Sequence, residues 1–169
     1  MYCAIDPSVH ATAVVWKTTL GNLWEGCCCP IADWLDIKYH LEIAKKQGVT
    51  VAVIERSMNF GPSARTQDQL AEARGRVVQM CRELGLEVVY IVPATWQGPM
   101  LGKLPRGGKT SKERTANRKA RKAASIRVAR DLGADDALLG MEGQEDDNVA
   151  DAVCIAAYAA LNELREEAA

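Results

Sequence analysis

The sequence has no apolar run approaching the roughly 20 residues that a membrane-spanning helix needs, and it contains a single phenylalanine. A strand-like run over residues 1–5 leads us to expect no secretory signal. Because aromatic residues make up only 5% of the chain, Val, Ile, Leu and Ala must fill most of its core. The length of 169 residues suits one domain, which we expect to be cytoplasmic.

The six cysteines do not form a pattern typical of a disulfide framework or a zinc site. Cys27, Cys28 and Cys29 are consecutive, and neighbours this close cannot all be bridged or all face one metal. No C-x-x-C pair exists. We therefore expect reduced cysteines that act as small apolar residues, in a reducing compartment. The only histidines, His10 and His40, are expected to be structural or exposed.

Hydrophobic periodicity predicts the element order β-β-β-α-β-α-β-α-α. The expected strands are residues 1–5, 11–16, 23–29, 49–54 and 86–92. Helices are expected after Pro30, after Ser63, over about 111–132 and over about 146–164, with a mobile basic loop over about 97–111 and a linker over 133–144. This order predicts one α/β domain whose mixed five-stranded sheet has three antiparallel and then two parallel strands, flanked by helices.

Four acids follow or end these elements in a way that predicts a metal site. Asp6 and Glu55 stand at the ends of the first and fourth strands, so they are adjacent if those strands pair. Asp147 and Asp151 are four residues apart and share one face of the last helix. Converging carboxylates repel and so favour Mg²⁺ or Mn²⁺, two of which can hydrolyse a phosphodiester. Alternatively, Asp6 is a turn former, and Asp147 or Asn148 is a helix cap.

The acids lie in a series of motifs that together resemble a known family. In chain order they are Ala4-Ile5-Asp6-Pro7-Ser8, Val53-Ile54-Glu55, Ala73-Arg74-Gly75 and Asp147-Asn148-Val149-Ala150-Asp151-Ala152. This series resembles the RuvC-type Holliday junction resolvases of the RNase H-like superfamily. The phrase over residues 92–96 resembles variants in phage genomes, which places the expected cytoplasm in a bacterial or phage-infected cell.

The resemblance implies a homodimeric, Mg²⁺-dependent endonuclease that resolves four-way DNA junctions, with Mn²⁺ able to substitute. Asp6, Glu55 and Asp151 would be catalytic residues that hold two metal ions. The chain departs from the family at Ser8, where Gly is frequent, and at Asn148, where the family has Asp or His. Asp147, one position earlier, is assigned the fourth catalytic and metal-binding role.

A basic block predicts the DNA contacts. Residues 103–130 hold eleven Lys and Arg against one acid, Glu113, while the rest of the chain is strongly acidic. Phe60 could stack on a base, and Arg74 is added because of the resemblance. The expected DNA-binding residues are therefore Phe60, Arg74, Lys103, Arg106, Lys109, Lys112, Arg114, Arg118, Lys119, Arg121 and Lys122. The run Gly107-Gly108-Lys109-Thr110 lacks P-loop spacing, so no nucleotide cofactor is expected.

Two other functions stay open at this stage. The same fold could cut RNA–DNA hybrids, flaps or phage DNA during processing. It could also be a DNA-binding module without catalysis, which the intact acids disfavour. A sugar-kinase-like or actin-like ATPase is disfavoured because such proteins need two domains of this kind.

Overall fold

The computed structural model describes residues 1–8, 10–18, 23–30, 32–56, 63–104, 108–139 and 146–162. Its centre is one five-stranded sheet with the strand order β3-β2-β1-β4-β5. The strands are β1 (Tyr2–Pro7), β2 (Ala11–Lys17), β3 (Trp24–Pro30), β4 (Val51–Glu55) and β5 (Glu87–Ile91). The first three strands are antiparallel, and β4 and β5 run parallel to β1, which confirms the predicted mixed sheet.

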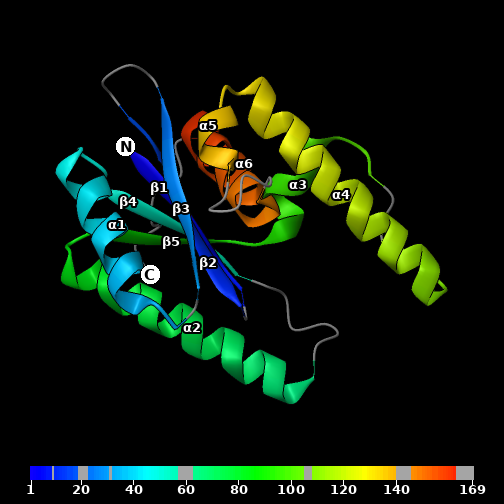
Figure 1. Ribbon diagram of the computed structural model, residues 1–169, viewed down its shortest axis with the longest axis horizontal. Coiled ribbons are helices and arrows are strands. Elements are labelled where there is room, and N and C mark those ends of the chain that lie inside the picture. The colour runs from blue at the N-terminus through cyan, green and yellow to red at the C-terminus, as the bar shows by residue number, and fades with distance from the viewer. Residues whose placement is uncertain are drawn as a thin grey trace.

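Helices cover both faces of this sheet (Figure 1). On one face lie α1 (Trp34–Lys46) and α2 (Ala64–Glu83), and on the other lie α3 (Pro93–Leu101), α4 (Ser111–Asp131), α5 (Asp135–Leu138) and α6 (Asp147–Asn162). None of the helices in the described ranges is long and apolar enough to span a membrane.

Strand alternation divides the core into two clusters, one on each face. Along β1, Cys3 and Ile5 point toward α1 and α2, whereas Ala4 points toward α6. Along β4, Val53 belongs to the α6 side and Ile54 to the opposite side. This period of two fixes which face each strand-end side chain must occupy.

Helix α6 is the central helix of the second layer. Nine of its residues are buried, five of them alanines, because it lies between the sheet and α4. Small side chains let the helix approach β1 and β2 closely. Any polar residue on its sheet-facing side is therefore held in a fixed position over the strands.

Two segments differ from the sequence expectation. Residues 97–101, expected in a mobile loop, complete the helix α3. Pro93 at the first position favours helix initiation, and the buried Trp96 and Leu101 anchor the helix to the core despite Pro99 within it. The expected linker after residue 133 contains the one-turn helix α5, which buries Leu138.

Candidate functional site

Asp6 and Glu55 lie side by side on the α6 face of the sheet. The parallel pairing of Ile5 with Ile54 puts them one residue further along neighbouring strands, as the sequence predicted on the condition that these strands pair. Their carboxyl groups share a hydrogen bond. Asp6 is 9% exposed, so this pair sits largely out of water.

Trp96 fixes the orientation of Glu55. Its indole Nε1 donates a hydrogen bond of 2.8 Å to Glu55 Oε1, from a side chain that is fully buried in α3. Trp96 was not predicted to belong to the site, because the segment around it was expected to be a loop. A tryptophan N–H is a donor only, so it suits an ionised carboxylate.

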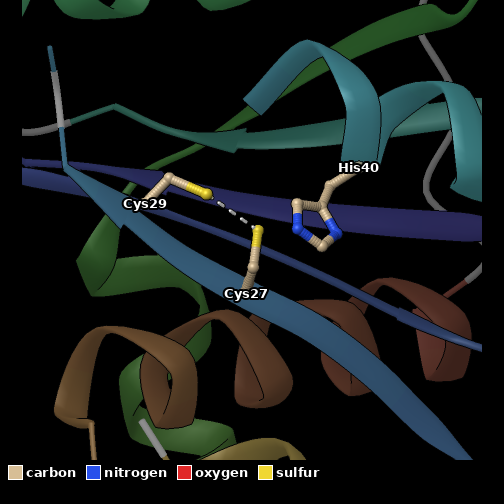
Figure 2. Close-up of side chains that lie close together, drawn as sticks. All are labelled: Cys27, Cys29 and His40. Carbon is tan, nitrogen blue, oxygen red and sulfur yellow. Dashed lines mark hydrogen bonds between the residues drawn. The ribbon is translucent and has the colours of Figure 1, made fainter. Parts of the chain in front are cut away.

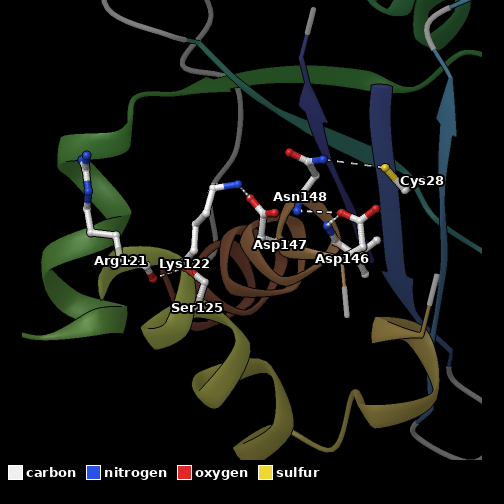
Figure 3. A network of polar contacts seen from close by, with 8 residues as sticks. Cys28, Arg121, Lys122, Ser125, Asp146, Asp147 and Asn148 are labelled. Atoms are coloured by element: carbon white, nitrogen blue, oxygen red, sulfur yellow. Dashed lines mark hydrogen bonds and ion pairs between the residues drawn. The ribbon is translucent and has the colours of Figure 1, made fainter. Parts of the chain in front are cut away.

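Helix α6 supplies the other two acids, Asp147 and Asp151. The residue that caps its N-terminus is Asp146, which was not expected in that role. Asp146 Oδ1 accepts hydrogen bonds from the backbone N–H groups of Asn148, at 2.8 Å, and Val149, at 3.3 Å. The Asn148 amide points to Cys28 on β3, at 3.9 Å from the sulfur, as Figure 3 shows. Asp147 is thus not the cap; its carboxylate forms an ion pair with Lys122 of α4.

The four acids face one another closely enough to disturb their ionisation. Burial raises the pKa of Asp6 well above its usual range, and Glu55, Asp151 and Asp147 add to the rise. Burial also raises the pKa of Glu55, against the hydrogen bonds from Trp96 and Asp6. The structure therefore brings together the four acids that the sequence proposed, at an excess of negative charge.

Opposing effects act on the ionisation of Asp151. Burial, with Glu55 and Asp147, raises its pKa to about 7, whereas a hydrogen bond from Ser125 and the charge of Lys122 oppose the rise. Ser125 is 1% exposed and lies on α4, where the Arg121 carbonyl, 3.3 Å away, is the alternative acceptor for its single hydroxyl proton. Sequence reasoning missed this serine because nothing in an Ala-rich helix indicates which small polar residue faces a carboxylate.

The donor set fits hard divalent cations. Carboxylate oxygens are the ligands that Mg²⁺ and Mn²⁺ prefer, and a cation would offset the repulsion that raises these pKa values. No three of these four acids have donor atoms that all lie within 4.8 Å of one another, whereas, among the described residues, Cys27, Cys29 and His40 do.

The predicted DNA-binding residues fall into two groups. Lys103, Lys109 and the α4 residues Lys112, Arg114, Arg118 and Lys119 are exposed, and Arg121 and Lys122 are half-buried nearer the acids. A capping box between Thr110 and Glu113 fixes the start of α4, whose first half stands clear of the rest of the molecule (Figure 1). The first half of α4 is thus a projecting basic arm, and Lys122, near the middle of the helix, contacts Asp147.

Other predicted contacts lie elsewhere. Arg74 is half-buried on α2, in the layer on the opposite side of the sheet from α4. The structure does not bring it to the basic arm. Phe60 and Arg106 lie outside the described residues.

No protein-family profile and no curated protein matches the sequence. A mixed sheet of this order with helices on both faces defines the RNase H-like class of folds. Within that class, the structure is similar to Thermus thermophilus RuvC in complex with a Holliday junction substrate. The TM-score is 0.60 at 17% identity, over 95% of this chain and 94% of that one.

A second structure, of Thermus thermophilus RuvC, gives a TM-score of 0.57 at 18% identity, with 97% of each chain covered. The chain therefore has a RuvC-like, RNase H-like fold over nearly its whole length.

Proposed function

We propose that this protein is a metal-dependent endonuclease that cleaves phosphodiesters in branched DNA, as a Holliday junction resolvase does. The observation that carries the proposal is the meeting of Asp6, Glu55, Asp147 and Asp151 on one face, beside Lys122 near the middle of the basic helix α4. Oxygen ligands beside a phosphate-binding surface are what metal-assisted phosphodiester hydrolysis requires. The similarity of fold to RuvC supports the same conclusion.

The four acids would be the catalytic, metal-binding residues, holding two Mg²⁺ ions, or Mn²⁺ in their place. When bound, such ions lower the pKa of water and stabilise the charge on the leaving oxygen. Trp96 would hold Glu55 in its ligating orientation, and Ser125 would do the same for Asp151. Asp147 is the better candidate for the fourth position than Asn148, because the Asn148 amide is directed toward Cys28.

The basic arm would bind DNA phosphates on either side of the cut. Contacts between phosphates and its exposed cations, Lys112, Arg114, Arg118 and Lys119, carry no sequence information, so the branched shape would decide the substrate. Resolution of a four-way junction needs two symmetric cuts, and we propose a homodimer for that reason. Lys103, Lys109 and Arg121 would be secondary contacts. A cytoplasmic setting in a bacterial or phage-infected cell fits such a substrate.

Cleavage of a synthetic four-way junction by wild type and Asp6→Asn tests the proposal. Wild type should cut the junction in Mg²⁺ and not in EDTA, while Asp6→Asn should bind it with unchanged affinity and fail to cut. Asp68→Asn, an exposed acid on α2, is the matched control and should cut normally. Equal cutting by Asp6→Asn and wild type would overturn the assignment of the acids.

Cleavage of a panel of substrates (four-way junction, hybrid, flap and linear duplex) tests which nucleic-acid structure the protein prefers. Preference for hybrid, flap or linear duplex over the junction would replace the branched-DNA substrate with another one for the same chemistry. Binding of the junction without cleavage in Mg²⁺ or Mn²⁺ would indicate a DNA-binding module instead.

A further inference from the structure

A second group of potential metal ligands lies on the opposite side of the sheet from the four acids. Cys27 and Cys29 come from β3, and His40 comes from α1, as Figure 2 shows. The two sulfur atoms are 3.3 Å apart, and one donor atom from each of the three residues lies within 4.8 Å of the others. His40, which was expected from the sequence to be a single structural or exposed residue, thus belongs to a cluster.

The strand pleat explains why three adjacent cysteines yield a pair. Cys27 and Cys29 are two residues apart and belong to the core cluster beneath α1 and α2, whereas Cys28 belongs to the cluster beneath α6. Three consecutive cysteines cannot all face one metal, as expected from the sequence. The first and the third can still share a site with a ligand from another element.

The spacing suits a small tetrahedral ion. With zinc–sulfur bonds of about 2.3 Å and tetrahedral angles, two thiolates lie roughly 3.8 Å apart. The observed 3.3 Å between Cys27 Sγ and Cys29 Sγ needs an opening of only about half an ångström, within the reach of a small side-chain rotation. An imidazole nitrogen as third ligand matches zinc and other borderline-soft ions, and not Mg²⁺.

Two neighbours give this cluster the surroundings of a metal site. Thr12 lies directly opposite Cys29 in the β2–β3 ladder, is fully buried, and has a hydroxyl with no hydrogen-bond partner in the described structure. Cys29 Sγ does not accept a hydrogen bond from this hydroxyl in the described structure, and the side-chain rotation that metal binding needs would have to bring the thiolate within reach. Asp36, one helical turn before His40 on α1, is exposed and close enough to act electrostatically on both Cys29 and His40.

We propose that Cys27, Cys29 and His40 form a zinc-binding site that ties the edge strand β3 to helix α1, with Asp36 or water as the fourth ligand. Binding replaces the two thiol protons, which pass to solvent, and Thr12 donates a hydrogen bond to the Cys29 thiolate. The site is independent of the proposed nuclease activity, because it uses different residues on the other face of the sheet.

Cobalt(II) is the probe for this site, because cobalt bound to thiolates shows charge-transfer absorption that cobalt bound to carboxylates lacks. The full-length protein, reduced and freed of metal, is titrated with Co²⁺ and then with Zn²⁺. Variants Cys27→Ser, Cys29→Ser and His40→Gln remove one ligand each. Cys28→Ser is the matched control on the same strand, and Asp6→Asn removes the contribution of the acidic site.

We expect one equivalent of Co²⁺ with thiolate charge-transfer absorption, displaced by Zn²⁺. Each of the three ligand variants should weaken Co²⁺ binding by at least 100-fold, whereas Cys28→Ser and Asp6→Asn should retain it. Thr12→Val, which preserves shape, should weaken it by about 10-fold while the variant stays folded by circular dichroism. Absence of the charge-transfer band in reduced wild type, or its equal loss in Cys28→Ser, would overturn the proposal.

Discussion

Replacing Asp151 with asparagine should stabilise the metal-free protein at pH 8 and remove the stabilisation that Mg²⁺ provides. Burial and the neighbouring Glu55 and Asp147 raise the pKa of Asp151 from 3.8 to about 7. Because the folded-state pKa lies above that of the unfolded chain, this carboxyl stabilises the fold fully below about pH 4. That contribution is lost as the pH rises through about 7.

The magnitude follows from the size of the shift. One pKa unit corresponds to about 1.4 kcal/mol, so the full shift of Asp151 sets an upper limit of about 4 kcal/mol. An asparagine at this position would be a weaker acceptor for Ser125, and the Asp151 side chain retains some exposure to water, which screens its charge. We expect the variant to gain about 1–3 kcal/mol at pH 8, or a few degrees to about 10 °C in Tm.

The assay is urea and thermal unfolding in EDTA at pH 5 and pH 8, repeated in Mg²⁺ at pH 8. The difference between variant and wild type should be larger at pH 8 than at pH 5. Mg²⁺ should raise the stability of wild type and leave Asp151→Asn almost unchanged. Asp68→Asn should differ from wild type by less than about 0.5 kcal/mol throughout. An Asp151→Asn variant that is less stable than wild type at pH 8 in EDTA would refute the reasoning.

Three further results are expected. Trp96→Phe removes the hydrogen-bond donor to Glu55 and keeps a buried aromatic ring. The Mg²⁺ concentration needed for half-maximal cleavage should therefore rise by about 10- to 100-fold. An unchanged Mg²⁺ titration would show that the hydrogen bond is dispensable. The double variant Arg118→Gln, Lys119→Gln should have a shallower slope of log affinity for the junction against log salt concentration. The slope should fall by about 0.9 for each phosphate that the helix no longer neutralises. An unchanged slope would exclude both residues from the interface. Thr110→Ala breaks the capping box and should speed amide hydrogen exchange in the first turn of α4. The free energy of unfolding should fall by about 1 kcal/mol or less. Exchange protection equal to that of wild type would mean that the cap is not needed.

Strand ends were the most predictable part of the site. A buried strand that stops at an acid indicates where its carboxylate lies, and pairing of β1 with β4 was enough to join Asp6 to Glu55. The helix spacing of Asp147 and Asp151 likewise placed both acids on one face. These features are local in sequence, so alternation and helical periodicity carry them.

Contacts between elements were not predictable in the same way. Trp96 was hidden because Gly98 and Pro99 are typical of loops, while the burial of Trp96 and Leu101 overrides that local preference. The capping role of Asp146 could not be separated from that of Asp147, since adjacent acids have equal cap propensity. The hydrogen bonds that Asp146 accepts from the Asn148 and Val149 backbone decide between them.

The pleat of the sheet has a chemical consequence for both proposals. It directs Asp6 toward α6 and Cys27 and Cys29 toward α1, so oxygen donors and sulfur–nitrogen donors are separated by the thickness of the sheet. Mg²⁺ would then bind on one face only, because it binds thiolates poorly, whereas Zn²⁺ can use either set of ligands. The sulfur–nitrogen face should fill first as Zn²⁺ is added. Inhibition of cleavage by competition at the acids should therefore begin only beyond the first equivalent of Zn²⁺, and in Cys27→Ser it should begin at once.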